Sequence, residues 1–148
     1  MHALDTMRME SGYLHWGHDI SPEENQYEAS LGFTVSFKKN INFVGKDALA
    51  KIKNKKIKKK LIMLTLENSN PGEPLLLHDE PIYLDNNIVG RTTSGNFSFC
   101  FNKNISYGYI SKDHLDDIGS KKIYIEVEKK KYLANLLEKP LNQKNIKI

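Results

Sequence analysis

The sequence predicts an α+β fold that is mainly β. A short N-terminal segment with helical and extended parts should precede a small, jelly-roll-like antiparallel β-barrel of about six strands. From Leu61 onward, short runs of alternating apolar and polar residues recur between turn signals, which is typical of an antiparallel barrel. Near the start of the chain, apolar residues recur at helical spacing instead. The chain has 148 residues, 39% of them hydrophobic, which suffices for one core.

The N-terminal part, which we assign to residues 1–53, contains two predicted helices and one predicted strand. Residues 3–14 predict the first helix, because four apolar residues lie near one helical stripe: Ala3, Leu4, Met7 and Leu14. The apolar stretch LGFTVSF, residues 31–37, follows a polar loop and predicts a strand. Residues 46–53 predict a second short helix, which runs into a lysine cluster.

The C-terminal part, residues 54–148, is expected to form the barrel. Residues 61–67, LIMLTLE, alternate like a strand, and Asp85-Asn86-Asn87 is typical of a hairpin turn between two strands. Four more stretches predict strands: SFCF, ISYGYI, KKIYIEVE and KYLANLLE. The last residues, NQKNIKI, are expected to form a tail.

The composition excludes several classes of protein. Cys100 is the only cysteine, so an intrachain disulfide and a cysteine metal cluster are excluded. The chain shows neither a secretion signal nor about 20 consecutive apolar residues, so we expect a soluble, cytoplasmic protein that does not interact with membranes. The net charge of +4 comes mainly from lysine, since Arg8 and Arg91 are the only arginines. Nucleic-acid-binding proteins usually use arginine, so a solvated lysine surface is the preferred interpretation.

The stretch HWGH, residues 15–18, is the best candidate for a metal site. Its two imidazoles, together with His2 and Asp19, could supply ligands to zinc. Ligands on a helix need to lie on one face, and Gly17 disfavours a continuous helix at this point. We therefore favour a packed or surface pair of histidines over a metal site.

Other polar stretches do not assemble a catalytic constellation. Residues 51–60 could contact phosphates, but they lack interleaved aromatic residues and arginines, so a solvated surface is favoured. Thr92-Thr93-Ser94-Gly95 could cradle an anion, although a strand end with a bulge is the preferred interpretation. Cys100 is expected to be buried and unreactive within SFCF, and Asp116 and Asp117 are adjacent in a polar turn.

Several segments, in the same order and at matching spacing, resemble the glycine cleavage T-protein family. Residues 3–32, ALDTMRMESGYLHWGHDISPEENQYEASLG, are similar to its signature of arginine-apolar-glutamate, glycine, aromatic-glycine and an acidic loop. FVGKDAL, residues 43–49, resembles the F-I-G-K/R-E-A-L segment that follows in that family. Residues 80–110 look like the C-terminal barrel of the same proteins, including a G-x-x-T-S-G strand. The resemblance covers essentially the whole chain.

Within this superfamily, RMESGYLHWGHDI and HDEPIYLDNNIVGRTTSG look closest to the branch of dimethylglycine and sarcosine dehydrogenases. Those proteins oxidise an N-methyl amine with FAD and pass the one-carbon unit to tetrahydrofolate in a T-protein-like half. The resemblance implies that residues 1–53 end a folate-binding domain. It also implies that the FAD domain, the catalytic aspartate and the glutamate that holds the pteridine lie upstream, so we do not expect this chain alone to be catalytic.

The resemblance also implies roles for individual residues. Tyr13 occupies the position of an aromatic residue near the folate, and Trp16 matches the family's aromatic residue before glycine, so both are expected to contact tetrahydrofolate. Leu4 replaces a folate-contacting arginine of the T-protein, which fits the dehydrogenase branch better. Arg8 and Glu10 match the arginine-x-glutamate pair and are expected to be structural, with different neighbours.

Three functions remain open from the sequence. The first is a C-terminal barrel that packs on the folate and FAD domains of a demethylating enzyme. The second is a small subunit that completes a separately encoded T-protein or flavoenzyme site in trans, with residues 3–14 as an interface or a surface for self-association. The third is a nucleic-acid-binding module that uses the lysine cluster.

Overall fold

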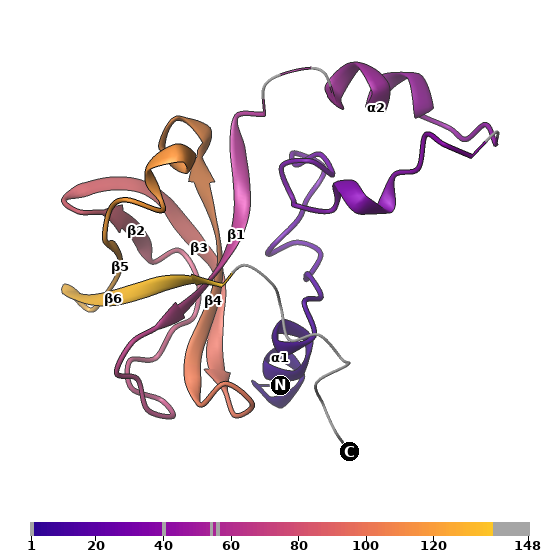
Figure 1. Cartoon of the computed structure of the whole chain (residues 1–148). Coiled ribbons are helices and arrows are strands. Elements are labelled where there is room, and N and C mark those ends of the chain that lie inside the picture. The colour runs from indigo at the N-terminus through magenta and orange to yellow at the C-terminus, as the bar shows by residue number, and fades with distance from the viewer. Residues whose placement is uncertain (1, 40, 54, 56, 138–148) are drawn as a thin grey trace.

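A computed structural model describes residues 2–39, 41–53, 55 and 57–137, which form a β-barrel and an N-terminal segment beside it (Figure 1). Six antiparallel strands close the barrel in the order β1-β4-β3-β2-β5-β6. The predicted fold class is therefore confirmed. The expected tail, NQKNIKI, lies outside the described residues. The strands are β1 (Lys59–Leu66), β2 (Pro81–Leu84), β3 (Asn87–Ser98), β4 (Lys103–Ser111), β5 (Ile123–Val127) and β6 (Lys130–Leu137).

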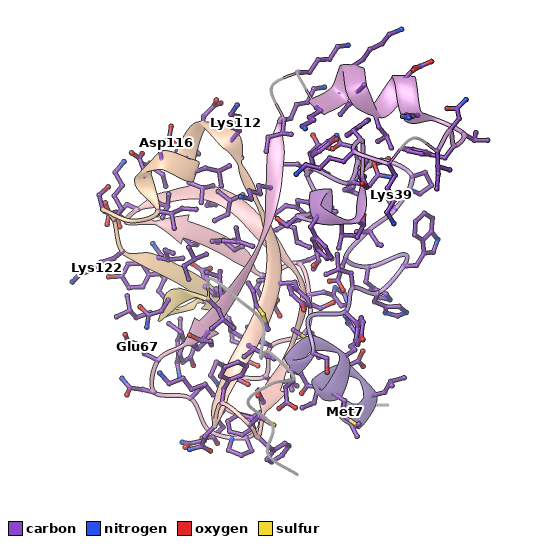
Figure 2. All side chains as sticks on the ribbon, turned by 45° about the vertical axis from the view of Figure 1, so that its right-hand side comes forward. Met7, Lys39, Glu67, Lys112, Asp116 and Lys122 are labelled. Atoms are coloured by element: carbon purple, nitrogen blue, oxygen red, sulfur yellow. The ribbon has the colours of Figure 1, made fainter. Side chains whose placement is uncertain are left out.

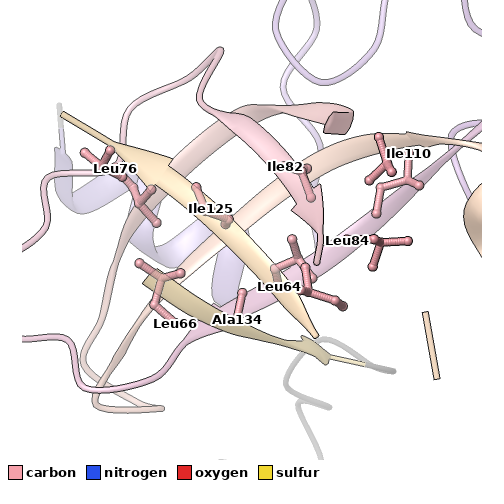
Figure 3. Close-up of a cluster of buried hydrophobic side chains, with 11 residues drawn as sticks. Leu64, Leu66, Leu76, Ile82, Leu84, Ile110, Ile125 and Ala134 are labelled. Carbon is pink, nitrogen blue, oxygen red and sulfur yellow. The ribbon is translucent and has the colours of Figure 1, made fainter. Parts of the chain in front are cut away.

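The barrel core follows from the two-residue period of the strands, which directs alternate side chains inward. In β5, for example, Ile123, Ile125 and Val127 are buried, whereas the two residues between them are more exposed. Burying one such aliphatic side chain contributes about 1.5–3 kcal/mol. Figure 3 shows the largest buried cluster, which includes Leu64, Leu66, Leu76, Ile82, Leu84, Ile110, Ile125 and Ala134.

The helices are short. They are α1 (His2–Glu10), α2 (Lys46–Lys53) and the 3-10 helices η1 (Gly32–Thr34) and η2 (Lys112–Asp117). α2 agrees with its prediction, whereas α1 ends before residue 14. Gly12 adopts a φ of 80° just after α1, and the Tyr13 N–H donates to the Arg8 carbonyl at 2.8 Å, which closes the helix end. Among the described residues, no helix is long and apolar enough to span a bilayer.

Two predicted strands are wrong. Residues 31–37 hold only η1, and Phe33 is 83% exposed. The barrel is closed, so its strands leave no free edge with which this stretch could pair. The predicted strand SFCF is interrupted because β3 ends at Ser98 and a turn follows. Cys100 lies in that turn and is exposed, so the prediction that it is buried is also wrong.

The N-terminal segment packs along β1, β3 and β4. Met9 of α1 is fully buried in a second cluster with Tyr107 and Tyr109 of β4. The Leu61 N–H of β1 donates to the Glu28 carbonyl at 2.7 Å. Segments far apart in the sequence thus share one interior, and residues 2–30 form part of the folded unit.

Two hairpin turns in the barrel differ in how well the sequence indicates them. Asp85 (φ 53°) lies in the predicted turn between β2 and β3, which is confirmed. Glu128 and Lys129, with φ values of 49° and 65°, join β5 and β6. Two consecutive positive φ values are typical of a type I′ turn, which prefers asparagine and glycine. The Glu-Lys pair therefore gives no recognisable turn signal.

We predict that Glu128→Asn combined with Lys129→Gly stabilises the barrel by about 0.5–1 kcal/mol, because both new residues tolerate positive φ better than the native pair. Urea unfolding measures the difference. Lys130→Gly, one residue further along and within β6, is the matched control and should destabilise the protein. An unchanged or lower midpoint for the turn variant would contradict the assignment of this turn.

Candidate functional site

The carboxylate of Asp19 is the buried centre of the contact between the N-terminal segment and the barrel. Its side chain is fully buried, and Arg8 Nη1 of α1 donates to Oδ2 at 2.7 Å. The His15 N–H donates to the same oxygen at 2.8 Å. From β3, Thr93 Oγ1 and Ser94 Oγ donate to Oδ1 at 2.6 and 2.7 Å. Four donors from three parts of the chain therefore compensate one buried negative charge.

A β-bulge explains how two consecutive residues of β3 reach the same carboxylate. Thr92 pairs with Gly108 and Ser94 with Tyr107, so Thr93 is the extra residue. In a regular strand, consecutive side chains point to opposite faces. The bulge turns both hydroxyls toward Asp19. The hydroxyl-rich stretch considered as an anion cradle thus does contact an anion, the carboxylate of Asp19, and the predicted bulge lies within β3 rather than at its end.

Arg8 and Glu10 have different neighbours, as expected. Arg8 Nε donates to Asp5 Oδ1 at 2.9 Å, and Nη2 donates to Ser94 Oγ at 3.0 Å. Glu10 Oε1 accepts from Ser98 Oγ at 2.6 Å and from the Cys100 N–H at 3.1 Å. Burial opposes ionisation of Glu10, but these hydrogen bonds outweigh it, so its pKa lies below the usual 4.5.

Two buried tyrosines of β4 complete the contact. Tyr107 Oη donates to the Met9 carbonyl at 3.2 Å, and Tyr109 Oη donates to the Asp19 carbonyl at 2.9 Å. Burial raises the pKa of both tyrosines, and the charge of Asp19 raises it further. Both hydroxyls therefore stay protonated and serve as donors, which fixes the ends of α1 and of the following loop on the barrel.

Tyr13 and Trp16, the two predicted folate contacts, lie on this loop and point away from the core. Their side chains are 62% and 65% exposed. Leu4 and Met7 of α1 are similarly exposed, at 63% and 65%. These four residues, which we call the outer apolar face, lie on a segment whose other side is bonded to the barrel. The structure thus leaves both candidate rings accessible to a ligand or a partner.

The HWGH histidines form an exposed pair. The rings of His15 and His18 stack with centroids 4.6 Å apart, and the ring of His18 lies 6.2 Å from that of His78. Asp19, which could have supplied a carboxylate ligand, accepts a hydrogen bond from Arg8 Nη1 instead. In the described part of the chain, no three or more histidine, cysteine, aspartate or glutamate side chains are arranged to hold a metal ion.

A groove of about 720 Å³ runs between the loop after Trp16 and the barrel. Two ion pairs line it: Lys59 with Glu24 at 2.5 Å and Arg91 with Asp79 at 2.8 Å. Lys58 and Glu23 add one more charge of each sign. Because the charges balance, the groove offers no excess positive charge to an anionic ligand. The exposed rings of Tyr13 and Trp16 remain the better candidate contacts.

Sequence reasoning did not identify the Asp19 network. The sequence indicated Asp19 only as a possible metal ligand, and no pattern in it singled out Tyr109. The partners of Asp19 on β3 are 74 and 75 residues away in the chain, so no local pattern links them. The hydroxyl-rich stretch in β3 was the available signal, but it does not identify the anion that it contacts.

Comparisons with known proteins agree with this architecture. Residues 59–142 match the model of the glycine cleavage T-protein C-terminal barrel domain, and residues 1–39 match that of the GCVT N-terminal domain. A solved aminomethyltransferase T of the glycine cleavage system from Bartonella henselae superposes with a TM-score of 0.76 and 23% identity. The superposition covers 95% of this chain and 38% of the solved chain. That likeness shows the fold.

Curated relatives include enzymes much longer than this chain. Human mitochondrial dimethylglycine dehydrogenase is 31% identical over 95% of this chain, which spans 16% of that enzyme. Mouse mitochondrial sarcosine dehydrogenase is 37% identical over 73% of this chain, which spans 11% of it. Aminomethyltransferase of Symbiobacterium thermophilum is 38% identical over 76% of this chain, which spans 29% of it.

We predict that Asp19→Ala costs about 3–5 kcal/mol of unfolding free energy, because it leaves the Arg8 side chain, which is 14% exposed, without its buried partner. Urea unfolding measures the loss, and limited proteolysis should then cut within residues 1–30 first. Asp116→Ala, at an exposed position, is the control and should change stability by less than about 0.5 kcal/mol. Equal midpoints for the two variants would contradict the role given to Asp19.

We also predict that Glu10 contributes stability that depends on pH. Its pKa is lower in the folded state than the usual 4.5, so the contribution is fully present above that value and is lost as the pH falls further. The stability advantage of the wild type over Glu10→Gln should therefore be constant above about pH 5 and shrink as the pH falls toward about 3 in urea titrations. Glu23→Gln, at an exposed position, is the control. A constant advantage across this range would rule out the mechanism.

Proposed function

Because the chain belongs to the family of the glycine cleavage T-protein C-terminal barrel domain, we propose that it serves as the barrel module of an N-methyl amine dehydrogenase. In this proposal, the module belongs to the tetrahydrofolate-dependent, aminomethyltransferase-like half of an FAD-dependent enzyme that acts on dimethylglycine or sarcosine. The relatives named dimethylglycine and sarcosine dehydrogenase support this assignment. A cytoplasmic location is part of the proposal, in keeping with a single cysteine.

The two-sided N-terminal segment is the observation that carries the proposal. Its inner side is fixed on the barrel through Asp19, Arg8 and Met9. Its outer apolar face leaves four large side chains more than 60% exposed within 13 residues. A cluster of exposed apolar residues on a rigidly held segment is typical of a protein interface. We assign this face to the contact with a folate-binding domain.

Tetrahydrofolate is the cofactor that fits the outer apolar face. Its aminobenzoate ring and the pyrimidine ring of its reduced pteridine are flat, and Tyr13 and Trp16 offer accessible aromatic rings for stacking. The backbone around them is fixed, since the Gly17 N–H donates to the Ile20 carbonyl at 2.8 Å. These residues would position the folate, and the acid-base chemistry is assigned to the upstream part of the enzyme. FAD is likewise assigned to a separate domain.

A second arrangement uses the same face. The chain could act in trans, as a small subunit that completes a separately encoded T-protein-like or flavoenzyme chain, or it could self-associate through residues 3–14. The exposure of Leu4 and Met7 on α1 favours either contact. The arrangement in trans differs from the fused module only in whether the partner is part of the same polypeptide, whereas in self-association the partner is a second copy of this chain.

Immunoblotting of native cell extracts with an antibody against the barrel separates these arrangements. A band near 17.0 kDa supports the subunit, and a much longer polypeptide supports the fused module. Affinity purification should then recover a T-protein-like folate domain or an FAD-dependent dehydrogenase, either as a partner or in the same chain. Recovery of unrelated proteins would overturn the proposal, as would demethylation or aminomethyl transfer by the purified 148-residue chain alone.

We predict that Leu4→Ser with Met7→Ser abolishes recovery of the partner, or dimer formation in analytical ultracentrifugation, while the barrel stays folded. Both side chains are exposed, so their replacement should change stability by less than about 0.5 kcal/mol. Leu75→Ser with Phe99→Ser, which removes two exposed apolar residues of the barrel, is the matched control. Equal recovery by the two double variants would show that the outer apolar face is not the interface.

A further inference from the structure

The positive charge of the chain is concentrated in one projecting part. Residues 33–58, which we call the lysine arm, contain eight lysines and a single acidic residue, Asp47, and therefore carry a formal charge of +7. The rest of the chain carries −3, since the total is +4. In Figure 1 the arm projects from the barrel, and α2 lies on the stretch that returns toward β1. Most of it, residues 40–58, lies between the two segments that match the family models.

The lysine arm also exposes large apolar side chains. Val44 is fully exposed, and Phe33 and Ile41 are 83% and 64% exposed. The described residues of α2 include no buried side chain, although the helix has apolar Leu49 and Ile52. A helix of two turns is marginal unless tertiary packing supports it. The arm thus presents apolar groups that this chain does not cover.

Lysines and apolar groups are interleaved on the arm. Lys53 Nζ lies 5.4 Å from the ring centroid of Phe37, and Lys46 Nζ donates to the Ile41 carbonyl at 3.2 Å. Lysine stems can lie along an apolar surface while their ammonium groups reach polar surroundings. This combination of a cationic layer and insertable apolar groups suits the boundary between lipid headgroups and acyl chains.

We propose that the lysine arm docks on an anionic lipid surface. The lysines of the arm that the structure describes would lie near the headgroup phosphates, and Phe33, Ile41 and Val44 would insert just below them. This binding would be peripheral, through a surface contact rather than a membrane-spanning segment. The proposal departs from our expectation, based on the sequence, of a protein without membrane contacts.

The chemistry of the arm favours lipid over nucleic acid. The arm contains no arginine, the residue that nucleic-acid interfaces prefer for phosphate forks and base stacking. The exposed Ile41 and Val44 are aliphatic and have no stacking partner among bases, whereas they can enter the acyl layer. The inference concerns residues other than the outer apolar face, which belongs to α1 and its following loop.

Vesicle flotation of the purified 148-residue chain tests this proposal. The probes are vesicles of equimolar phosphatidylglycerol and phosphatidylcholine, and vesicles of phosphatidylcholine alone. We expect binding to the anionic vesicles that weakens with salt, and none to the neutral ones. The triple variant Lys51→Gln, Lys53→Gln and Lys55→Gln should lower the partition coefficient about 100-fold, because each lysine contributes ~1 kcal/mol of binding free energy. Phe33→Ser with Val44→Ser should lower it roughly tenfold or more.

A matched triple variant controls for net charge. Lys122→Gln with Lys129→Gln and Lys130→Gln removes three exposed lysines of the barrel, and Figure 2 places Lys122 on the opposite side of the molecule from Lys39 of the arm. This control should bind anionic vesicles within about twofold of the wild type. Circular dichroism confirms that each variant is folded.

Three results would overturn the proposal. The first is no binding of the wild type to anionic vesicles. The second is an equal loss in the arm and barrel variants, which would indicate a nonspecific charge effect. The third is tighter binding to a single-stranded oligonucleotide than to vesicles, with the same dependence on arm lysines, which would assign the arm to nucleic acid. None of these results bears on the role proposed for the outer apolar face.

Discussion

One buried carboxylate determines how the two parts of this protein fit together. Asp19 is 1% exposed, and an uncompensated charge at such a site would cost several kcal/mol. Its donors come from α1, from its own loop and from the bulge in β3, so each of these has to be in place for the others to be stable. The exposed positions of Tyr13 and Trp16 follow from this constraint, since the loop that carries them is fixed at Asp19.

The constraint gives the N-terminal segment two sides with different roles. The inner side, with Met9 and Thr6, is packed and bonded against the barrel; Thr6 Oγ1, for example, donates to the Phe97 carbonyl at 3.0 Å. The outer apolar face is exposed, and we propose that it contacts a folate-binding domain. The lysine arm continues from the same segment with a separate chemistry. The barrel therefore acts as a rigid support. Both proposed binding surfaces, the outer apolar face and the lysine arm, lie on the part of the chain that precedes β1.

The barrel could be predicted from sequence because its signal is local. Alternating apolar residues in β1 and β5, and the Asp85-Asn86 turn, each specify their own conformation. Residues 31–37 were mispredicted because a strand needs a neighbouring edge, which a closed barrel does not provide. The Asp19 network could not be predicted because it joins residues 74 and 75 positions apart. The exposure of Tyr13 and Trp16 depends on that network.

Hydrogen exchange on the wild-type chain tests most directly whether this network joins the two parts. The amides of Tyr13 and Asp19, which are bonded inside the N-terminal segment, are compared with amides of β4 in the barrel. If Asp19 fixes the segment on the barrel, both sets should be protected and should open in the same cooperative step as denaturant is added. Rapid exchange of the segment while the barrel stays protected would contradict this account.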